Sequence, residues 1–109
     1  MGTDGARTAP ANVAKAAKRG LELRQQFRRG GTEVGARRAA QLADGKPVSD
    51  ADVVAIASYF KRHSVDKRAK THRWGDEDDP SAGYIAWLLW GGDAGEAWAT
   101  REREKLAVT

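Results

Sequence analysis

Apolar side chains recur along this chain at spacings of three and four residues, the pattern of amphipathic helices. The first such segment runs from about Val13 to Arg29. Asn12 is the expected N-cap, and Gly30 and Gly31 are the expected stop. A second helix is predicted from Glu33 to Ala43, with Thr32 as its cap and Gly45 just past its end. Alanines on one side of this second helix favour close packing on a neighbour.

The third helix has the clearest boundary signals. Ser49 and Asp52 have the spacing of a capping box, with Asp in place of Glu, and Val48 can pack onto Val53. The apolar positions that follow predict a helix from Asp50 to about His63. A polar connection over 64–79 follows, and its length favours a structured loop.

Two further helices are predicted after this connection. Asp79 and Pro80 suit the N-cap and first position of a fourth helix through Trp90, which is apolar nearly all round and is therefore expected to be central. Gly91 and Gly92 end it, and Asp93 opens a fifth helix whose charged 101–105 run is expected to be its solvated end. Because no segment shows period-two alternation, we predict an all-α, compact bundle of about five short helices.

The length and composition fit this picture. A chain of 109 residues with 40% hydrophobic residues supports one core, so we predict a flexible arm over 1–11 and a single helical domain over 12–106. With no cysteine, disulfides, thiolate nucleophiles and cysteine-ligated zinc are excluded. No apolar run is long enough to span a bilayer and no signal-peptide pattern follows Met1, so we expect a soluble protein without a membrane role.

The charges are divided unevenly along the chain. Residues 1–73 hold 16 of the 19 basic side chains and 7 of the 15 acidic ones, a net charge of +9, whereas residues 74–109 have a net charge of −5. This division permits a polyanionic partner for the basic part. It equally permits the acidic part to pack on the chain's own basic helices or on those of a neighbouring copy.

The basic side chains are the main candidate for a binding site. If the predicted helices are antiparallel neighbours, these side chains can form one surface for nucleic-acid phosphates, although a solvated basic surface without a partner is an equally ordinary outcome. The predicted nucleic-acid-binding residues are Lys15, Lys18, Arg19, Arg28, Arg29, Arg37, Arg38, Lys61, Arg62, Lys67, Arg68 and Trp74. Six residues separate the second and third helices, which is long for a helix-turn-helix motif, so contacts to the DNA backbone are favoured over base reading.

The four tryptophans have two different interpretations. Trp87, Trp90 and Trp98 lie on or beside the central helix and are best explained as core. Trp74 lies in the polar connection and could either stack on a base or close over the core as a lid.

Catalytic and metal-binding patterns are weak. His63 and His72 are nine residues apart, which matches no compact metal motif, and His63 is better explained by its place at a helix C-terminus. The acidic run over 76–79 lacks the pattern of a calcium loop and is expected to pair with Arg68 or Arg73, or to lie at the start of the fourth helix. No phosphate-loop or hydrolase motif is present, so neither an enzyme nor a cofactor or metal is predicted.

Four segments carry a family resemblance. The sequences GTEVG at 31–35, SYFKRH at 58–63, VDK at 65–67 and PSAGYIAWLLWGGD at 80–93 resemble a small module of tailed phages and prophages that stands alone or beside head-region proteins such as prohead proteases. The resemblance covers about Val13 to Trp98, and the last segment is its most specific part. It implies a phage origin and a place in the host cytoplasm or the virion, but it assigns no catalytic residue.

Two functions follow from these observations. The first is a non-enzymatic helical binding module that contacts nucleic acid through phosphates, with non-specific DNA as its expected partner. The alternative is a virion or head-associated protein interaction module that binds phage head proteins or a second copy of itself, which suits the charge division.

Overall fold

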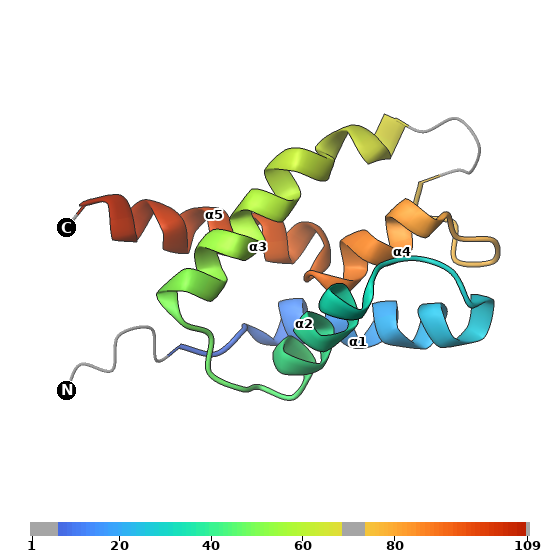
Figure 1. The fold of residues 1–109 in the computed structure, drawn as a ribbon, viewed down its shortest axis with the longest axis horizontal. Coiled ribbons are helices and arrows are strands. Elements are labelled where there is room, and N and C mark those ends of the chain that lie inside the picture. The colour runs from blue at the N-terminus through green and yellow to red at the C-terminus, as the bar shows by residue number, and fades with distance from the viewer. Residues whose placement is uncertain (1–6, 69–73, 109) are drawn as a thin grey trace.

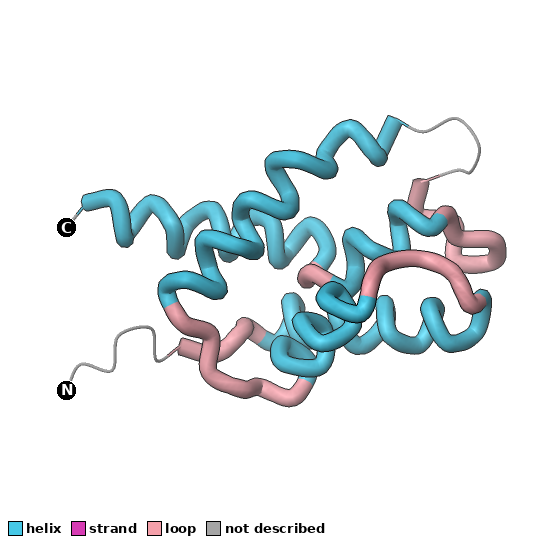
Figure 2. The backbone as a smooth tube through the Cα atoms, viewed as in Figure 1, coloured by secondary structure: helices cyan, strands magenta, loops and turns pink. Residues whose placement is uncertain are grey.

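The structure is a computed structural model that describes residues 7–68 and 74–108. Within these ranges the chain forms five α-helices and no named strand, so the prediction of an all-α bundle is confirmed (Figures 1 and 2). The helices are α1 (Ala11–Phe27), α2 (Glu33–Ala43), α3 (Asp50–His63), α4 (Ala82–Leu89) and α5 (Gly92–Val108), with a short 3-10 helix, η1 (Ser64–Arg68), after α3. No described helix is long and apolar enough to cross a membrane.

The bounds of α2 and α3 are as predicted. The Thr32 hydroxyl accepts a hydrogen bond from the Gly35 amide at the start of α2, and Gly45 has a φ of +68° just after its end. At α3, the Ser49 hydroxyl accepts from the Asp52 amide while the Asp52 carboxylate accepts from the Ser49 amide. This capping box satisfies helix-end amides that would otherwise lack a partner.

Helix α1 begins and ends earlier than the sequence predicts. Its N-cap is Pro10, whose carbonyl accepts from the amides of Val13 and Ala14, so Asn12 lies inside the helix and caps nothing. The helix ends at Phe27 because Arg28 adopts a left-handed conformation with a φ of 54°. Val13, Ala17, Gly20 and Leu23 form its buried face.

The starts of α4 and α5 also differ from the prediction. Ser81 is the N-cap of α4, where its hydroxyl accepts from the Tyr84 amide. The predicted cap, Asp79, instead contacts Arg29, and Pro80 is buried before the helix starts. Helix α5 begins at Gly92, one residue before the predicted opening at Asp93.

Helix α4 is central, as predicted, because α1, α2 and α5 all pack against it. Its side chains Ile85, Trp87 and Leu89 are fully or almost fully buried. The backbones of α1 and α4 approach closely at Gly20, where any side chain would meet the backbone of α4. Trp87 and Trp98 are buried and confirm the core interpretation, whereas Trp90 is half-buried at the edge of the core.

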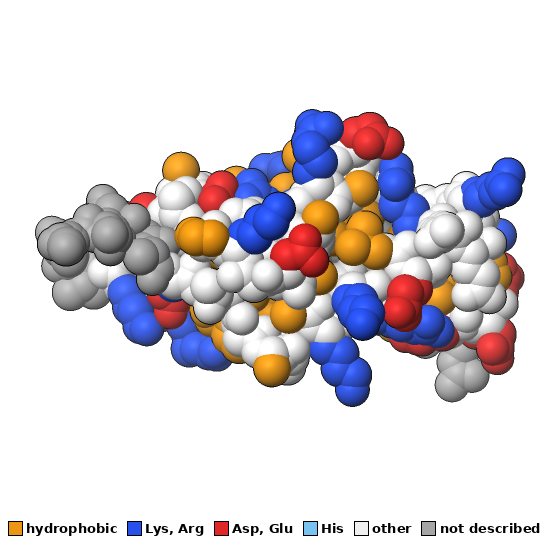
Figure 3. Space-filling model, turned by 90° about the horizontal axis from the view of Figure 1, so that it is seen from below, with side chains coloured by type: hydrophobic (Ala, Val, Ile, Leu, Met, Phe, Trp, Pro, Cys, Tyr) orange, Lys and Arg blue, Asp and Glu red, His pale blue; other side chains and the backbone are white. Residues whose placement is uncertain are grey.

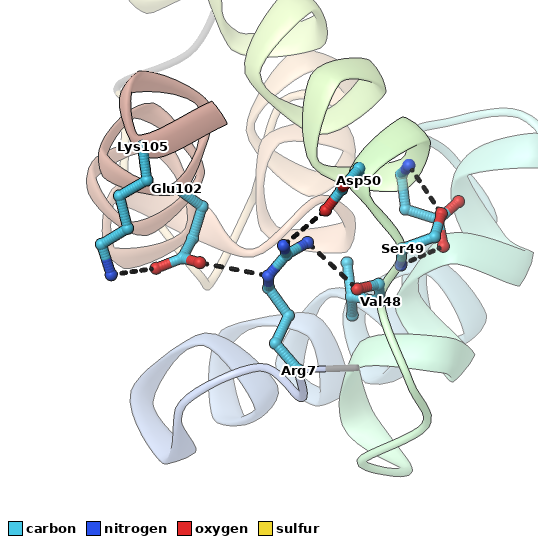
Figure 4. Close-up of polar contacts among 7 residues, drawn as sticks. Arg7, Val48, Ser49, Asp50, Glu102 and Lys105 are labelled. Carbon is cyan, nitrogen blue, oxygen red and sulfur yellow. Dashed lines mark hydrogen bonds and ion pairs between the residues drawn. The ribbon is translucent and has the colours of Figure 1, made fainter. Parts of the chain in front are cut away.

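The end of the predicted arm is part of the fold. Arg7 forms a β-bridge with Val48 and donates to the Val48 carbonyl and to Asp50, and its Nε lies 3.1 Å from a carboxylate oxygen of Glu102 (Figure 4). Residues 7–10 therefore hold the start of α3 beside α5, and position 11 is helical. The rest of the predicted arm, residues 1–6, lies outside the described residues. Glu102 and the half-buried Leu106 show that the end of α5 is also partly packed rather than only solvated.

Candidate nucleic-acid interface

Helix α1 and the residues after it carry five of the predicted contacts. Lys15 and Lys18 are exposed on α1, and Arg28 is exposed just after its end. Among the described residues these three side chains form no ion pair. Arg19 and Arg29 differ, because both bind carboxylates of the acidic 76–79 run.

The acidic run therefore packs on α1. Arg19 donates to Glu77 over 2.7 Å, and Arg29 donates to Asp79 over 3.0 Å and to the Pro80 carbonyl over 2.9 Å. The hydrogen bond from Arg19 lowers the pKa of Glu77. Burial and the hydrogen bond that Tyr84 donates to Glu77 raise the pKa of that phenol to about 12.

These pairs replace the partners that the sequence predicted for the acidic run. Arg73 lies outside the described residues, as does the side chain of Arg68. The folded chain uses α1 because the 76–79 loop passes beside it. Of the two interpretations of the charge division, internal packing of acidic on basic residues is present in the structure.

Arg38 on α2 and Lys67 on η1 both bind carboxylates of the chain, Arg38 in a mostly buried pair and Lys67 in an exposed one. Arg38 contacts Asp52 at 2.9 Å, donates to Gln41, and lies over the ring of Trp90. Burial opposes ionisation of Asp52, but hydrogen bonds from Arg38, Gln41 and the Ser49 amide outweigh it and hold the pKa of the carboxyl well below its ordinary value. These contacts tie α2 to the start of α3.

Lys67 makes a similar internal contact near α5. Its Nζ lies 2.9 Å from the Asp93 carboxylate and 4.5 Å from the centre of the Trp87 ring. Asp93 also accepts a hydrogen bond from the Trp87 indole, and the hydrogen bond from Lys67 lowers the pKa of this carboxyl. Lys67 therefore covers one edge of the core with its ammonium in an ion pair that is exposed to solvent.

Trp74 also faces the core. Its ring meets Tyr84 and Trp87 edge to face, with ring centres 5.3 and 5.7 Å apart. It packs against the main hydrophobic cluster and is half-buried. Of the two sequence interpretations, this geometry is that of a lid over the core.

The remaining predicted residues whose side chains are described are exposed on two helices, Arg37 on α2 and Lys61 and Arg62 on α3. Helix α1 packs on α2 and α4, whereas α3 packs mainly on α5. Lys61 lines a groove between α3 and α5 together with Glu96 and Glu104, away from α1. On the underside of the molecule, basic side chains alternate with acidic and apolar ones along its whole length (Figure 3). Helix α3 is therefore not a main packing partner of α1, so the antiparallel pairing of these helices that the sequence-based surface assumed is not present among the described residues.

A basic hollow lies where α1 ends. It has a volume of about 670 Å³ and is lined by Arg24, Gln25, Arg28, Arg29, Gly30 and Gly31. Arg24 lines its wall, where its guanidinium donates to the Gly30 carbonyl over 3.1 Å and lies 3.4 Å from a carboxylate oxygen of Glu33. Arg28 is exposed there.

A second hollow lies between α3, α4 and the start of α2. Its volume is about 470 Å³, and its lining includes Val34, Tyr59, Arg62, His63, Gly83 and Trp90. Tyr59 stacks on Trp90 with ring centres 4.6 Å apart and on His63 with ring centres 4.4 Å apart. We call this the aromatic hollow.

The sequence pattern indicates only some of the contacts that form the aromatic hollow. Tyr59 and His63 are four residues apart and so share one face of α3. Trp90 and Val34 come from other helices, and nothing in the local pattern places them beside Tyr59. Among the described residues no group of three or more His, Asp or Glu side chains could hold a metal ion, and His72 lies outside them.

Comparison with protein-family models, with curated proteins and with solved structures finds no match to this chain.

Proposed function

We propose that this chain is a non-enzymatic nucleic-acid-binding module that contacts phosphates along α1. The observation that carries the proposal is the position of Lys15, Lys18 and Arg28, three exposed cations without an ion pair among the described residues. Lys15 and Lys18 lie on α1 and Arg28 follows its last residue, so at a rise of about 1.5 Å per residue the first and last are about 20 Å apart along the helix axis. Cations at this spacing can contact several successive phosphates of one strand.

The basic hollow extends this row. Arg28 lines it and forms no ion pair among the described residues, so a backbone that follows α1 meets this guanidinium at the end of the row, beside the Arg24 side chain that is paired with Glu33. Arginine suits this position because its planar group can bind a phosphate through two parallel hydrogen bonds. The proposed contact set is therefore smaller than the sequence predicted, because Arg19, Arg29, Arg38 and Lys67 bind carboxylates of the chain itself.

The test is binding of a DNA duplex at several salt concentrations, measured by fluorescence anisotropy. Each phosphate contact contributes a slope of about −0.9 to the logarithm of affinity against the logarithm of salt. We expect the triple variant Lys15→Ala, Lys18→Ala, Arg28→Ala to weaken binding equally on all sequences and to flatten this slope.

A matched triple variant controls for net charge. Lys46, Arg101 and Arg103 are exposed, lie off α1 and form no ion pair among the described residues, so their replacement by alanine removes the same charge. This variant should keep most of the affinity. Equal loss in both triple variants, or no binding by the wild type at low salt, contradicts the proposal. The predicted alternative, a phage head-protein partner, would then be the function to pursue.

A further inference from the structure

We infer that the aromatic hollow takes an unpaired base of single-stranded nucleic acid. This inference rests on the proposed function, since the phosphates of the same strand would lie along α1. The first argument is chemical. The half-buried Trp90 and His63 belong to the lining of the hollow, and every nucleic-acid base can pack its own flat face on aromatic side chains.

The lining and volume of the hollow suit a nucleic-acid base. On the α4 side the lining residues are small, Ala82, Gly83 and Ala86, whereas aromatic rings line the α3 side. Val34, which is 54% exposed, adds an apolar edge. A volume of about 470 Å³ lies within the range of ordinary small-ligand sites and accommodates one base with its sugar.

The charge of the hollow favours an anionic strand. Arg62 is exposed at its edge and forms no ion pair among the described residues, and no carboxylate belongs to the lining. A phosphate next to the bound base would therefore meet a guanidinium and no opposing acid.

The position of the hollow connects it to α1. Gly31 lines both the basic hollow and the aromatic hollow, so the two are neighbours. A strand whose backbone follows α1 to Arg28 can thus place its next base in the aromatic hollow, whereas a base inside a duplex cannot leave its stack without cost. This continuity favours a nucleic-acid strand over a protein segment as the occupant.

The experiment compares three probes: a dT oligonucleotide, an abasic oligonucleotide of the same length, and a duplex. The abasic strand keeps the phosphates and lacks the bases. We expect the wild type to bind dT about tenfold more tightly than the abasic strand. Val34→Glu and Arg62→Ala should each reduce dT binding toward the abasic level and leave duplex binding nearly unchanged.

The chain offers matched controls. Val54→Glu and Arg101→Ala make the same chemical changes at exposed positions outside the hollow. A new carboxylate at position 34 lies in the first turn of α2, where the helix dipole favours it, so folding is expected to be retained and is checked by circular dichroism. Both controls should bind dT as the wild type does.

The outcomes separate this inference from the proposed function. Equal binding of dT and abasic strands overturns the inference and leaves phosphate binding along α1 intact. No binding of any probe overturns both. If Val34→Glu instead abolishes self-association seen by light scattering and leaves dT binding unchanged, the hollow is a protein interface and the inference is wrong.

Discussion

Gly20 of α1 lies directly against Leu89 of α4: a Cβ atom built on Gly20 would lie 2.8 Å from the Leu89 backbone nitrogen. This approach sets the distance between α1 and the central helix.

The substitution Gly20→Ala should therefore destabilise the protein. Alanine would raise helix propensity by about 1 kcal/mol, but the added methyl group meets backbone that cannot move aside as a side chain could. We expect a net loss of about 1–3 kcal/mol in the free energy of unfolding, measured by urea denaturation. Asn12→Ala, at an exposed position of α1 that caps nothing, is the control and should be neutral or stabilising. An unchanged urea midpoint for Gly20→Ala would show that α1 and α4 can move apart to accommodate the methyl group.

Arg7 should contribute to stability through its three partners, Val48, Asp50 and Glu102. Its side chain is 21% exposed, so the contacts are only partly screened by solvent. Arg7→Ala should lower the free energy of unfolding by about 1–2 kcal/mol. Arg7→Lys should restore little of this loss, because an ammonium cannot reproduce the planar arrangement of donors. Full rescue by lysine would mean that only the charge matters.

The pH dependence of stability should report the Asp52 contacts. The pKa of Asp52 is lower in the folded state than in the unfolded chain, where it is near 3.8. The stabilisation that ionised Asp52 gives the folded state is therefore fully present above the unfolded pKa. It is lost as the pH falls through the folded pKa. We expect Asp52→Asn to lower stability at neutral pH and to reduce the loss of stability on acidification below about pH 5. If the free energy of unfolding falls with pH equally in the variant and the wild type, Asp52 does not contribute to the pH dependence of stability.

The substitution Trp74→Ala tests whether the Trp74 ring stabilises the fold by packing over the core. The ring packs on Tyr84 and Trp87, so its removal should cost about 2–4 kcal/mol of stability. Trp74→Phe should retain much of this packing. Neither variant should change the affinity for dT at a temperature where both are folded. A selective loss of dT binding in Trp74→Phe would show that Trp74 contacts the nucleic acid.

Much of the helical architecture could be read from the sequence because its causes are local. The Thr32 cap, the Ser49–Asp52 capping box and Gly45 each satisfy or end a helix within a few residues, so α2 and α3 have their predicted bounds. The apolar run of α4 is equally local, and it made this helix identifiable as central. Where Asn12 and Asp79 were expected as caps, a competing neighbour, Pro10 or Ser81, takes the position.

The binding surface depended on contacts between distant parts of the chain. The sequence shows that Arg19, Arg29 and Arg38 are basic, but it cannot show that each lies within 3.0 Å of a carboxylate at least fourteen positions away. The aromatic hollow likewise exists only because α3 and α4 bring Tyr59 and Trp90 together. Local hydrogen bonding therefore determined the helices, whereas the packing of α1, α3 and α4 decided which charges are neutralised and which side chains face solvent.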